Sequence, residues 1–184
     1  MAQPKVQIKF TYKDYKSLPE SETKRFELWE GELVMVPSPT TYHQRISKRL
    51  EITLIEHIEG SGLGEVLHAP LDVILSEEIV LQPDIIFIAK EHSEIIAEEG
   101  IRGAPDLVVE ILSPATAERD RTYKRTLYAR YGIREYWLVD PREKTAEVLE
   151  WTESGYRRSG LYRDDEVLSS PLLDLEIELS QVFR

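Results

Sequence analysis

The sequence predicts an α/β fold, in which helices connect the central strands and β-rich segments stand at both ends. The first observation is the aliphatic run at 107–112, which is typical of a strand covered on both faces. The second is the segment after it, where apolar side chains recur at four-residue steps from Tyr123 to Tyr131 and predict a helix. The third is a long amphipathic pattern over about 40–59. The 184 residues contain no internal repeat or linker, so we expect a single domain over 1–184.

The N-terminal half predicts a loose end or edge strand, then helices and paired strands in turn. The turn at Glu30-Gly31 between two apolar runs indicates a hairpin, and Thr40 or Thr41 is a suitable cap for the long helix. The Gly60-Ser61-Gly62 segment ends that helix. The expected elements are the end at 1–10, a short helix at 11–18, the hairpin strands at 26–29 and 33–36, the helix to Glu59, and strands at 65–68, 71–75 and 84–89.

The C-terminal half predicts the central strand, one helix and further strands. Gly132 marks the end of the helix that starts at Thr116 or Ala117, and Pro141 stops the strand that follows. The expected elements are a polar loop or short helix at 90–103, strands at 107–112, 135–141, 145–151, 156–162 and 175–179, and turns at Ser154-Gly155 and Asp164-Asp165.

Composition and charge exclude several classes of protein. The chain has no cysteine, which rules out disulfides, thiolate catalysis and cysteine-ligated zinc. No apolar stretch approaches the roughly 18 residues of a membrane helix, so we expect no membrane partner and a cytoplasmic location. The net charge of −11 argues against a general polyanion binder. A local excess stands out at 113–134, where six basic residues face two acids for a balance of +4.

Glu110 does not fit its apolar surroundings. It lies between Val109 and Ile111 in the predicted central strand, where a carboxylate loses its hydration and needs a compensating partner. A metal ion or a lysine would supply one. Lys124 lies on the first turns of the following helix and is expected to point back toward the strand end.

A second acid, Asp84, has a similar setting. It follows Pro83, which suits the first residue of a strand because proline cannot donate to the ladder, and it opens an aliphatic run. Two acids on neighbouring strands and a nearby lysine make a hydrolytic metal site plausible. Structural alternatives stay open: a buried ion pair between Glu110 and Lys124, a strand-entry role for Asp84, and a helix-surface position for His43.

Several segments, in this order along the chain, resemble the Uma2 (Uma-two) family, a branch of the PD-(D/E)XK restriction-endonuclease-like superfamily. The segments are Trp29-Glu30-Gly31-Glu32-Leu33, Pro39 with His43-Gln44-Arg45-Ile46, Gln82-Pro83-Asp84, 103–114, Arg119-Asp120 with Lys124, Leu127-Tyr128-Ala129, 132–141 and Val182-Phe183. The resemblance implies a restriction-endonuclease-like core, with a curved mixed β-sheet, helices on both sides and the acids at one sheet edge.

The resemblance also implies the residues of an active site. Asp84 and Glu110 would be the two acids of the superfamily signature. The signature lysine should stand two residues after the glutamate, but that position is Leu112, and Lys124 is the match on the following helix. The remaining candidates are Gln82, His43 and Arg121 for the substrate, and the backbone carbonyl of Ile111 and the carboxylate of Glu32 for a metal.

The implied function is a Mg²⁺-dependent endonuclease that hydrolyses phosphodiester bonds in DNA, with Mn²⁺ as a second candidate ion. Lys124 would orient the attacking water or help to deprotonate it, a role that lysine plays when its pKa is lowered. The alternative is a catalytically inactive module that keeps the nuclease fold and binds nucleic acid or protein. A two-carboxylate glycosidase has no support beyond the acids themselves. A homodimer that joins two basic strips across a duplex is a further expectation.

Overall fold

The computed structural model describes residues 8–19 and 25–184, and its centre is a mixed sheet. Six strands form this sheet in the order β12-β11-β10-β9-β6-β3. They are β3 (Gly64–His68), β6 (Ile85–Ala89), β9 (Leu107–Ile111), β10 (Glu135–Asp140), β11 (Thr145–Thr152) and β12 (Gly155–Arg163). Only β9 and β10 run parallel, and the other neighbours pair antiparallel. The predicted central strand therefore lies inside the sheet, between β6 and β10.

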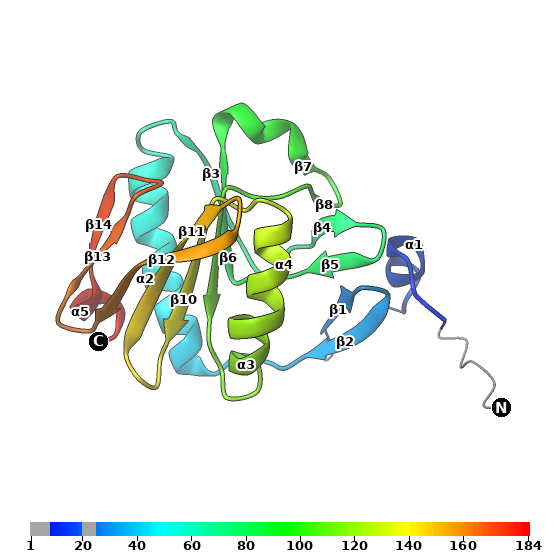
Figure 1. Ribbon diagram of the computed structural model, residues 1–184, viewed down its shortest axis with the longest axis horizontal. Coiled ribbons are helices and arrows are strands. Elements are labelled where there is room, and N and C mark those ends of the chain that lie inside the picture. Colours follow the sequence, from blue (N-terminus) through cyan, green and yellow to red (C-terminus); the bar gives the residue numbers. More distant parts are fainter. Residues whose placement is uncertain (1–7, 20–24) are drawn as a thin grey trace.

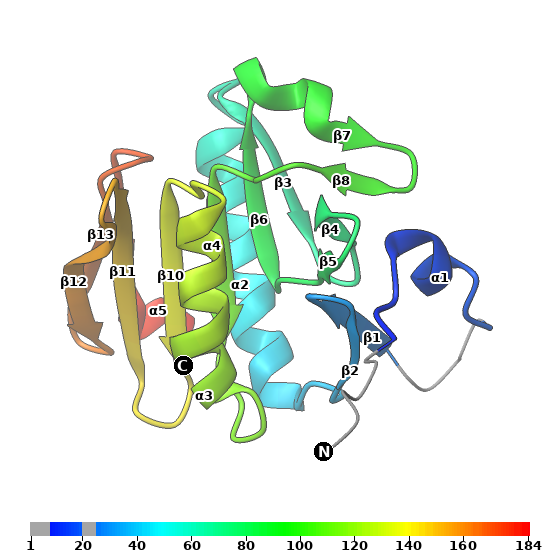
Figure 2. The same ribbon diagram turned by 45° about the vertical axis from the view of Figure 1, so that its right-hand side comes forward.

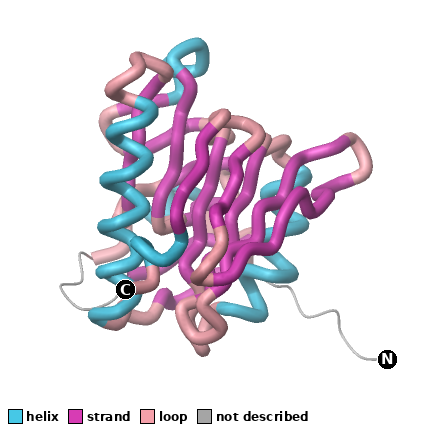
Figure 3. The backbone as a smooth tube through the Cα atoms, turned by 90° about the vertical axis from the view of Figure 1, so that its left-hand side faces the viewer, coloured by secondary structure: helices cyan, strands magenta, loops and turns pink. Residues whose placement is uncertain are grey.

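Helices cover both faces of the central sheet (Figures 1 and 2). One face carries α2 (Thr41–Ile58), and the other carries the crossover segment between β9 and β10. This segment, called the crossover helix below, is continuous in space and consists of α3 (Ala117–Arg119), the π-helical turn η2 (Asp120–Lys124) and α4 (Arg125–Arg130). Figure 3 shows the long helix on one side of the strands and further helices on the other.

Alternation along β9 decides which side chains meet which helix. Val109 and Ile111 pack in the same core cluster as the apolar stripe of α2, whose Ile46, Leu50, Leu54 and Ile58 are fully buried. Val108 and Leu112 pack in the cluster of Leu127 and Tyr128 from the crossover helix. Glu110 has the same parity as Val108 and Leu112, so its side chain faces the crossover helix.

The N-terminal hairpin belongs to a second sheet, of order β2-β1-β5-β4-β8-β7. Its strands are β1 (Arg25–Trp29), β2 (Glu32–Val36), β4 (Val73–Ser76), β5 (Ile79–Leu81), β7 (Ile96–Ala97) and β8 (Gly100–Arg102). The predicted turn is confirmed, because Trp29 pairs with Glu32 and both turn residues have positive φ, 47° at Glu30 and 88° at Gly31. Such a two-residue turn matches the twist of a hairpin.

The remaining elements flank these sheets. They are α1 (Tyr12–Lys16), the 3₁₀ helix η1 (Lys90–Ile95), and the C-terminal β13 (Val167–Ser170), β14 (Leu175–Glu178) and α5 (Leu179–Val182). The Thr11 side chain accepts a hydrogen bond from the Asp14 N–H and caps α1, and Tyr42 OH donates to the Phe183 carbonyl at 2.9 Å. Among the described residues, helices lack the length and apolar character that a membrane crossing requires.

Several predicted elements differ from the structure. The prediction for 1–10 lies outside the described residues up to residue 7, and 8–10 has no regular structure. The segment at 90–103, expected as a loop or short helix, also contains β7 and β8. The strand expected at 71–75 starts at Val73 and lies in the second sheet. The short β5, β13 and α5 were not predicted, since elements of three or four residues have too little periodicity to be recognised.

Candidate active site

The two predicted acids lie opposite one another at one end of neighbouring strands. Ile85 of β6 pairs with Val109 of β9 in antiparallel register, so Asp84 stands opposite Glu110, one residue beyond. Asp84 Oδ2 accepts a hydrogen bond of 2.7 Å from the Ile111 N–H, which continues the connection between the strands through a side chain. The register therefore brings both acids to the same edge of the sheet.

Lys124 reaches this edge from the crossover helix. Its Nζ lies 2.9 Å from Glu110 Oε1, 3.2 Å from Glu27 Oε1 and 3.6 Å from Asp120 Oδ1, and all four side chains are buried. Tyr128 OH donates to the same Glu110 oxygen at 2.8 Å. Helical steps of four residues place Asp120, Lys124 and Tyr128 on one face of the crossover helix.

Glu27, which sequence reasoning missed, is a third acid of the site. It lies on β1, and its Oε1 accepts from both Lys124 Nζ and the backbone N–H of Gln82, the latter at 2.8 Å. Its Oε2 accepts from Trp29 Nε1 at 2.8 Å. The available signal was a glutamate between Phe26 and Leu28 in an apolar strand, the same pattern that singled out Glu110.

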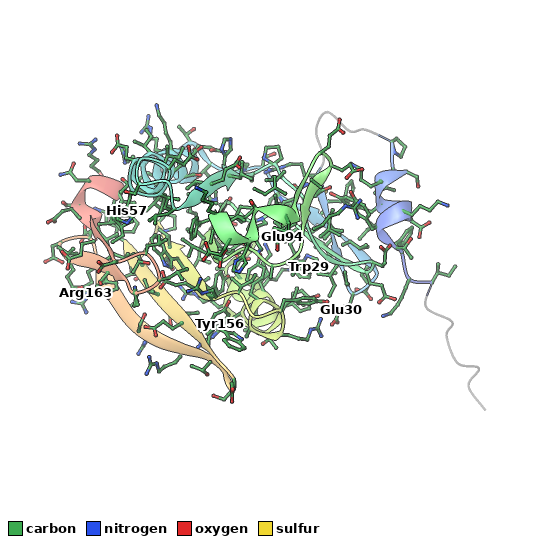
Figure 4. All side chains as sticks on the ribbon, turned by 90° about the horizontal axis from the view of Figure 1, so that it is seen from above. Trp29, Glu30, His57, Glu94, Tyr156 and Arg163 are labelled. Atoms are coloured by element: carbon green, nitrogen blue, oxygen red, sulfur yellow. The ribbon has the colours of Figure 1, made fainter. Side chains whose placement is uncertain are left out.

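The hairpin that carries Glu27 also packs against the crossover helix through residues at its turn. The Trp29 and Tyr123 rings stack with centroids 4.6 Å apart, and Arg130 pairs with Glu30 at 3.1 Å. Figure 4 shows Trp29 and Glu30 on the side of the hairpin that meets this helix. These contacts fix the distance between β1 and the helix, and with it the contact between Glu27 and Lys124.

His43 lies on the first turn of α2, and its Nε2 is 3.2 Å from Asp84 Oδ2. Burial acts to lower the pKa of His43, but the Asp84 carboxylate and the Ile111 carbonyl more than offset it and raise the pKa above 6.5. Its Nδ1 is buried and accepts or donates no hydrogen bond among the described residues. Two of the predicted metal-binding groups, Asp84 and the Ile111 carbonyl, therefore both raise the pKa of this imidazole.

The site holds more negative than positive charge. Glu27, Asp84, Glu110 and Asp120 would contribute −4 if ionised, and Lys124 and Arg25 contribute +2, which leaves −2. Burial is the largest cause that raises the pKa of Glu110, and the other acids add to it, while Lys124 acts in the opposite direction. A protonated carboxyl or a bound cation would reduce this surplus.

The same acids hold the Lys124 ammonium in its charged form. Burial lowers the pKa of Lys124, but Glu110, Glu27 and Asp120 outweigh it and raise that pKa well above 10.5. A general base needs the opposite shift. The expected role in orienting the attacking water agrees with this environment, whereas deprotonation of water by Lys124 does not.

A pocket of about 50 Å³ opens over these groups. Some of the predicted site residues line this pocket and others do not. The pocket is lined by Arg25, Glu27, Val36, Pro37, Ser38, Pro39, His43, Gln82, Asp84, Glu110, Ile111, Ser113, Thr116, Asp120 and Lys124. Two candidates lie elsewhere. Arg121 pairs with Asp140 at 2.9 Å and with Glu147 at 3.7 Å, and Glu32 lies exposed on β2, outside this lining.

The donor chemistry of the pocket suits a hard divalent cation, although the ligands are not arranged as a closed shell. Carboxylate and carbonyl oxygens are what magnesium prefers, and it keeps several waters of its own. No three histidine, aspartate or glutamate side chains converge as a metal cluster within residues 8–19 and 25–184. Asp84, Glu110 and the Ile111 carbonyl can therefore hold an ion only as a partial shell that water or phosphate completes.

Comparison with known proteins decides the family. The family model Uma2, described as "Putative restriction endonuclease", matches residues 12–181. This chain belongs to the Uma2 family. The family description assigns it to the restriction-endonuclease-like nucleases, and the resemblance expected from the sequence is confirmed.

Two proteins from Synechocystis sp. and one solved structure resemble the chain along most of its length. Uncharacterized protein slr1290 is 23% identical over 182 residues, which covers 96% of this chain and 92% of the relative. Uncharacterized protein sll1609 is 26% identical over 132 residues, 71% of this chain and 74% of the relative. The crystal structure of a putative nuclease belonging to DUF820 from Anabaena variabilis has a TM-score of 0.78 at 21% identity and covers 95% of this chain and 97% of that one. This likeness confirms the expected restriction-endonuclease-like fold.

Proposed function

We propose that this Uma2 chain is a Mg²⁺-dependent endonuclease that hydrolyses phosphodiester bonds in DNA, with Mn²⁺ as an alternative ion. The main support is that Asp84, Glu110 and Lys124 meet in one pocket, with Lys124 Nζ 2.9 Å from Glu110. Two acids and a lysine at a sheet edge are the groups that the family resemblance implied. That they converge from a loop, a strand and a helix argues against an incidental surface ion pair.

The residues of the pocket have complementary roles in this proposal. Asp84, Glu110 and the Ile111 carbonyl would hold the ion, which when bound supplies charge neutralisation and a more acidic water. The Lys124 ammonium, fixed by Glu110 and Glu27, offers a positive charge to a phosphate oxygen or to the attacking water. His43 stands beside Asp84, where its imidazole can contact a phosphate.

One observation favours a second candidate, a module that keeps the fold and binds nucleic acid or protein without catalysis. Lys124 and Tyr128 both contact Glu110 Oε1, so this oxygen already has two protein partners. A buried ion pair of this kind is self-sufficient when its hydrogen bonds are made. In this case the cluster would have a structural role, holding the crossover helix on the sheet, and no catalytic one.

Plasmid cleavage distinguishes the two candidates. We expect wild-type protein to cleave circular DNA, supplied both as a supercoiled plasmid and as a single strand, in Mg²⁺ or Mn²⁺ and to lose this activity in EDTA. Asp84→Asn and Glu110→Gln should each reduce the rate by more than the about 10- to 100-fold that outer-shell partners of a metal typically cost. Glu65→Gln, at an exposed position of β3, is the matched control and should cleave like wild type.

Two results would reject the nuclease proposal. One is cleavage that persists in both acid variants, which would indicate a contaminating enzyme. The other is DNA binding without turnover in any divalent metal, which would favour the second candidate. The proposed homodimer is tested separately by sedimentation, and a monomer at working concentration would remove it.

A further inference from the structure

Two larger hollows flank the carboxylate pocket, and Arg25 lines all three spaces. The first, here the α1 hollow, has a volume of about 390 Å³ and includes Tyr15, Lys16 and Phe26. The second, the α2 hollow, has a volume of about 450 Å³, includes Lys48 and His68, and extends to Asp84. Each has the size of a small-molecule site, so each can hold about one nucleotide unit.

The cations of the hollows differ from those of the predicted basic segment. Arg25, Lys16 and Lys48 form no ion pair among the described residues. By contrast, Arg121 and Arg134 of the basic segment pair with Asp140 and Asp106. The local excess of +4 is therefore partly neutralised, and the cations available for phosphates surround the pocket instead.

The acids that line the hollows already have partners. Asp72 accepts from Tyr15 OH and from the Gln82 amide, both at 2.9 Å. Glu51 lies 2.6 Å from His68, and Glu99 lies 3.4 Å from Arg102. Their oxygens are thus engaged by donors of the protein. Because the donors to Asp72 are neutral, the cations of the hollows must offset the charge of Asp72 when a phosphate binds.

The shape of the site favours one strand over two. The Glu110 side chain is only 6% exposed and that of Asp84 20%, so the reacting phosphate must enter a recess. The aromatic rings of Tyr15 and Phe26 and the exposed imidazole of His68 line the hollows on either side. Unpaired bases can stack on such rings, whereas the bases of a duplex already stack on one another.

We propose that the α1 hollow, Arg25 and the α2 hollow form one binding track for a single DNA strand. This inference rests on the proposed nuclease function and specifies its substrate: single-stranded DNA, bound with the reacting phosphate over Asp84 and one neighbouring nucleotide in each hollow. The overall charge of −11 agrees with it, because a duplex needs a broad basic surface.

Binding in EDTA tests the track without any cleavage. The probe is fluorescein-labelled oligothymidylate of about 16 nucleotides, the upper end of single-domain site sizes, compared with a duplex of the same length by anisotropy. We expect the single strand to bind at least about tenfold more tightly than the duplex. With three cations engaged, log K against log salt should have a slope of about −2, since each phosphate contact on a single strand contributes about 0.7.

Matched variants identify the track. Arg25→Gln and Lys48→Gln should each make the slope less negative by about 0.7. Arg25→Lys keeps the charge and should leave the slope unchanged. Lys90→Gln and Arg163→Gln change exposed cations that line neither hollow and should behave like wild type. An unchanged melting temperature in every variant shows that the fold is retained.

The outcomes separate the track from the nuclease. Duplex binding as tight as single-strand binding, or equal slopes in test and control variants, would overturn the track and leave plasmid cleavage as an independent result. Single-strand binding that depends on Arg25 and Lys48 would support the track. If such binding occurred without cleavage in Mg²⁺, the nuclease proposal would fail while the binding site stood.

Discussion

Removal of the Lys124 ammonium is the perturbation that examines the charge balance of the site most directly. Lys124→Met keeps most of the buried side-chain volume and deletes the positive charge. Glu110, Glu27 and Asp120, at 2.9, 3.2 and 3.6 Å from Nζ, would then face one another without a cation. Each of the three is no more than 5% exposed, so water cannot replace the lost partner.

The expected cost is about 3–5 kcal/mol in the free energy of unfolding, the range found when one partner of a buried ion pair is removed. Lys144→Met is a control, because its partner Asp164 lies 3.2 Å away and both side chains are about half exposed. That variant should lose less than about 1 kcal/mol. The pKa of Lys124 is raised, so its contribution is complete at neutral pH and is lost only as the pH rises through that raised value.

Urea denaturation of four proteins measures the effect: wild type, Lys124→Met, Glu110→Gln and the double variant. Because glutamine carries no charge, the double variant should recover at least about 1 kcal/mol relative to Lys124→Met alone. The loss in Lys124→Met should also decrease as the pH falls, since Glu110 accepts a proton more readily than an ordinary glutamate. A loss below about 1 kcal/mol at neutral pH, or no recovery in the double variant, would refute the electrostatic account.

Three further predictions concern parts of the chain outside the pocket. Glu135→Ala should cost about 3 kcal/mol in urea, because the buried carboxylate accepts three hydrogen bonds, including 2.5 Å from Ser170 Oγ, at about 1 kcal/mol each. The hydrogen bond and charge of Asp106 raise the pKa of His92 above 6.5, so wild-type stability should decline as the pH rises through that raised value, and His92→Gln should remove the decline. Gly31→Ala should lower the melting temperature, since φ is 88° and a Cβ there would lie 2.6 Å from a neighbouring side-chain carbon.

Each of these has its own control. Glu135→Gln keeps one acceptor and should lose less than the alanine variant, and equal losses would contradict the hydrogen-bond explanation. For His92, a pH dependence that survives the glutamine substitution would assign it to another group. For Gly31, Gly62→Ala has a positive φ of 67° without any atom within 4 Å, so a larger loss at Gly31 isolates the effect of the clash.

The central part of the fold could be predicted because its sequence patterns are long and local. The run at 107–112 and the four-residue steps to Tyr131 identified β9 and the crossover helix from chain neighbours alone. Asp84 and Glu110 were placed at one edge, and the antiparallel register of β6 and β9 provides the physical reason. That register is set by tertiary packing, so the sequence could suggest the pair but not the contact.

The rest of the site depends on contacts that no local pattern contains. Glu27 is buried because the hairpin packs against the crossover helix, nearly 100 residues later in the chain, and a strand pattern alone leaves its exposure undecided. Asp120 was named only as part of the family resemblance, and its burial, at 1% exposed, comes from the packing of the crossover helix. The π-helical turn from Asp120 to Lys124 has no sequence signature that we could apply. Arg121 was expected at the substrate, but in the structure its guanidinium pairs with Asp140. The sequence of the basic segment does not show which of its cations have such partners.

The placement of Lys124 on a helix instead of a strand has a consequence for how the chain folds. Glu27 and Glu110 come from the hairpin and the central sheet, and the ammonium that both of them contact arrives with the crossover helix. A partly open state, with the helix moved away from the sheets, would leave Glu27 and Glu110 close together without compensation. We expect their repulsion to raise the free energy of such a state and thus to favour concerted docking of hairpin, sheet and helix. On this reasoning the groups proposed for catalysis would also make the folding transition of the domain more cooperative.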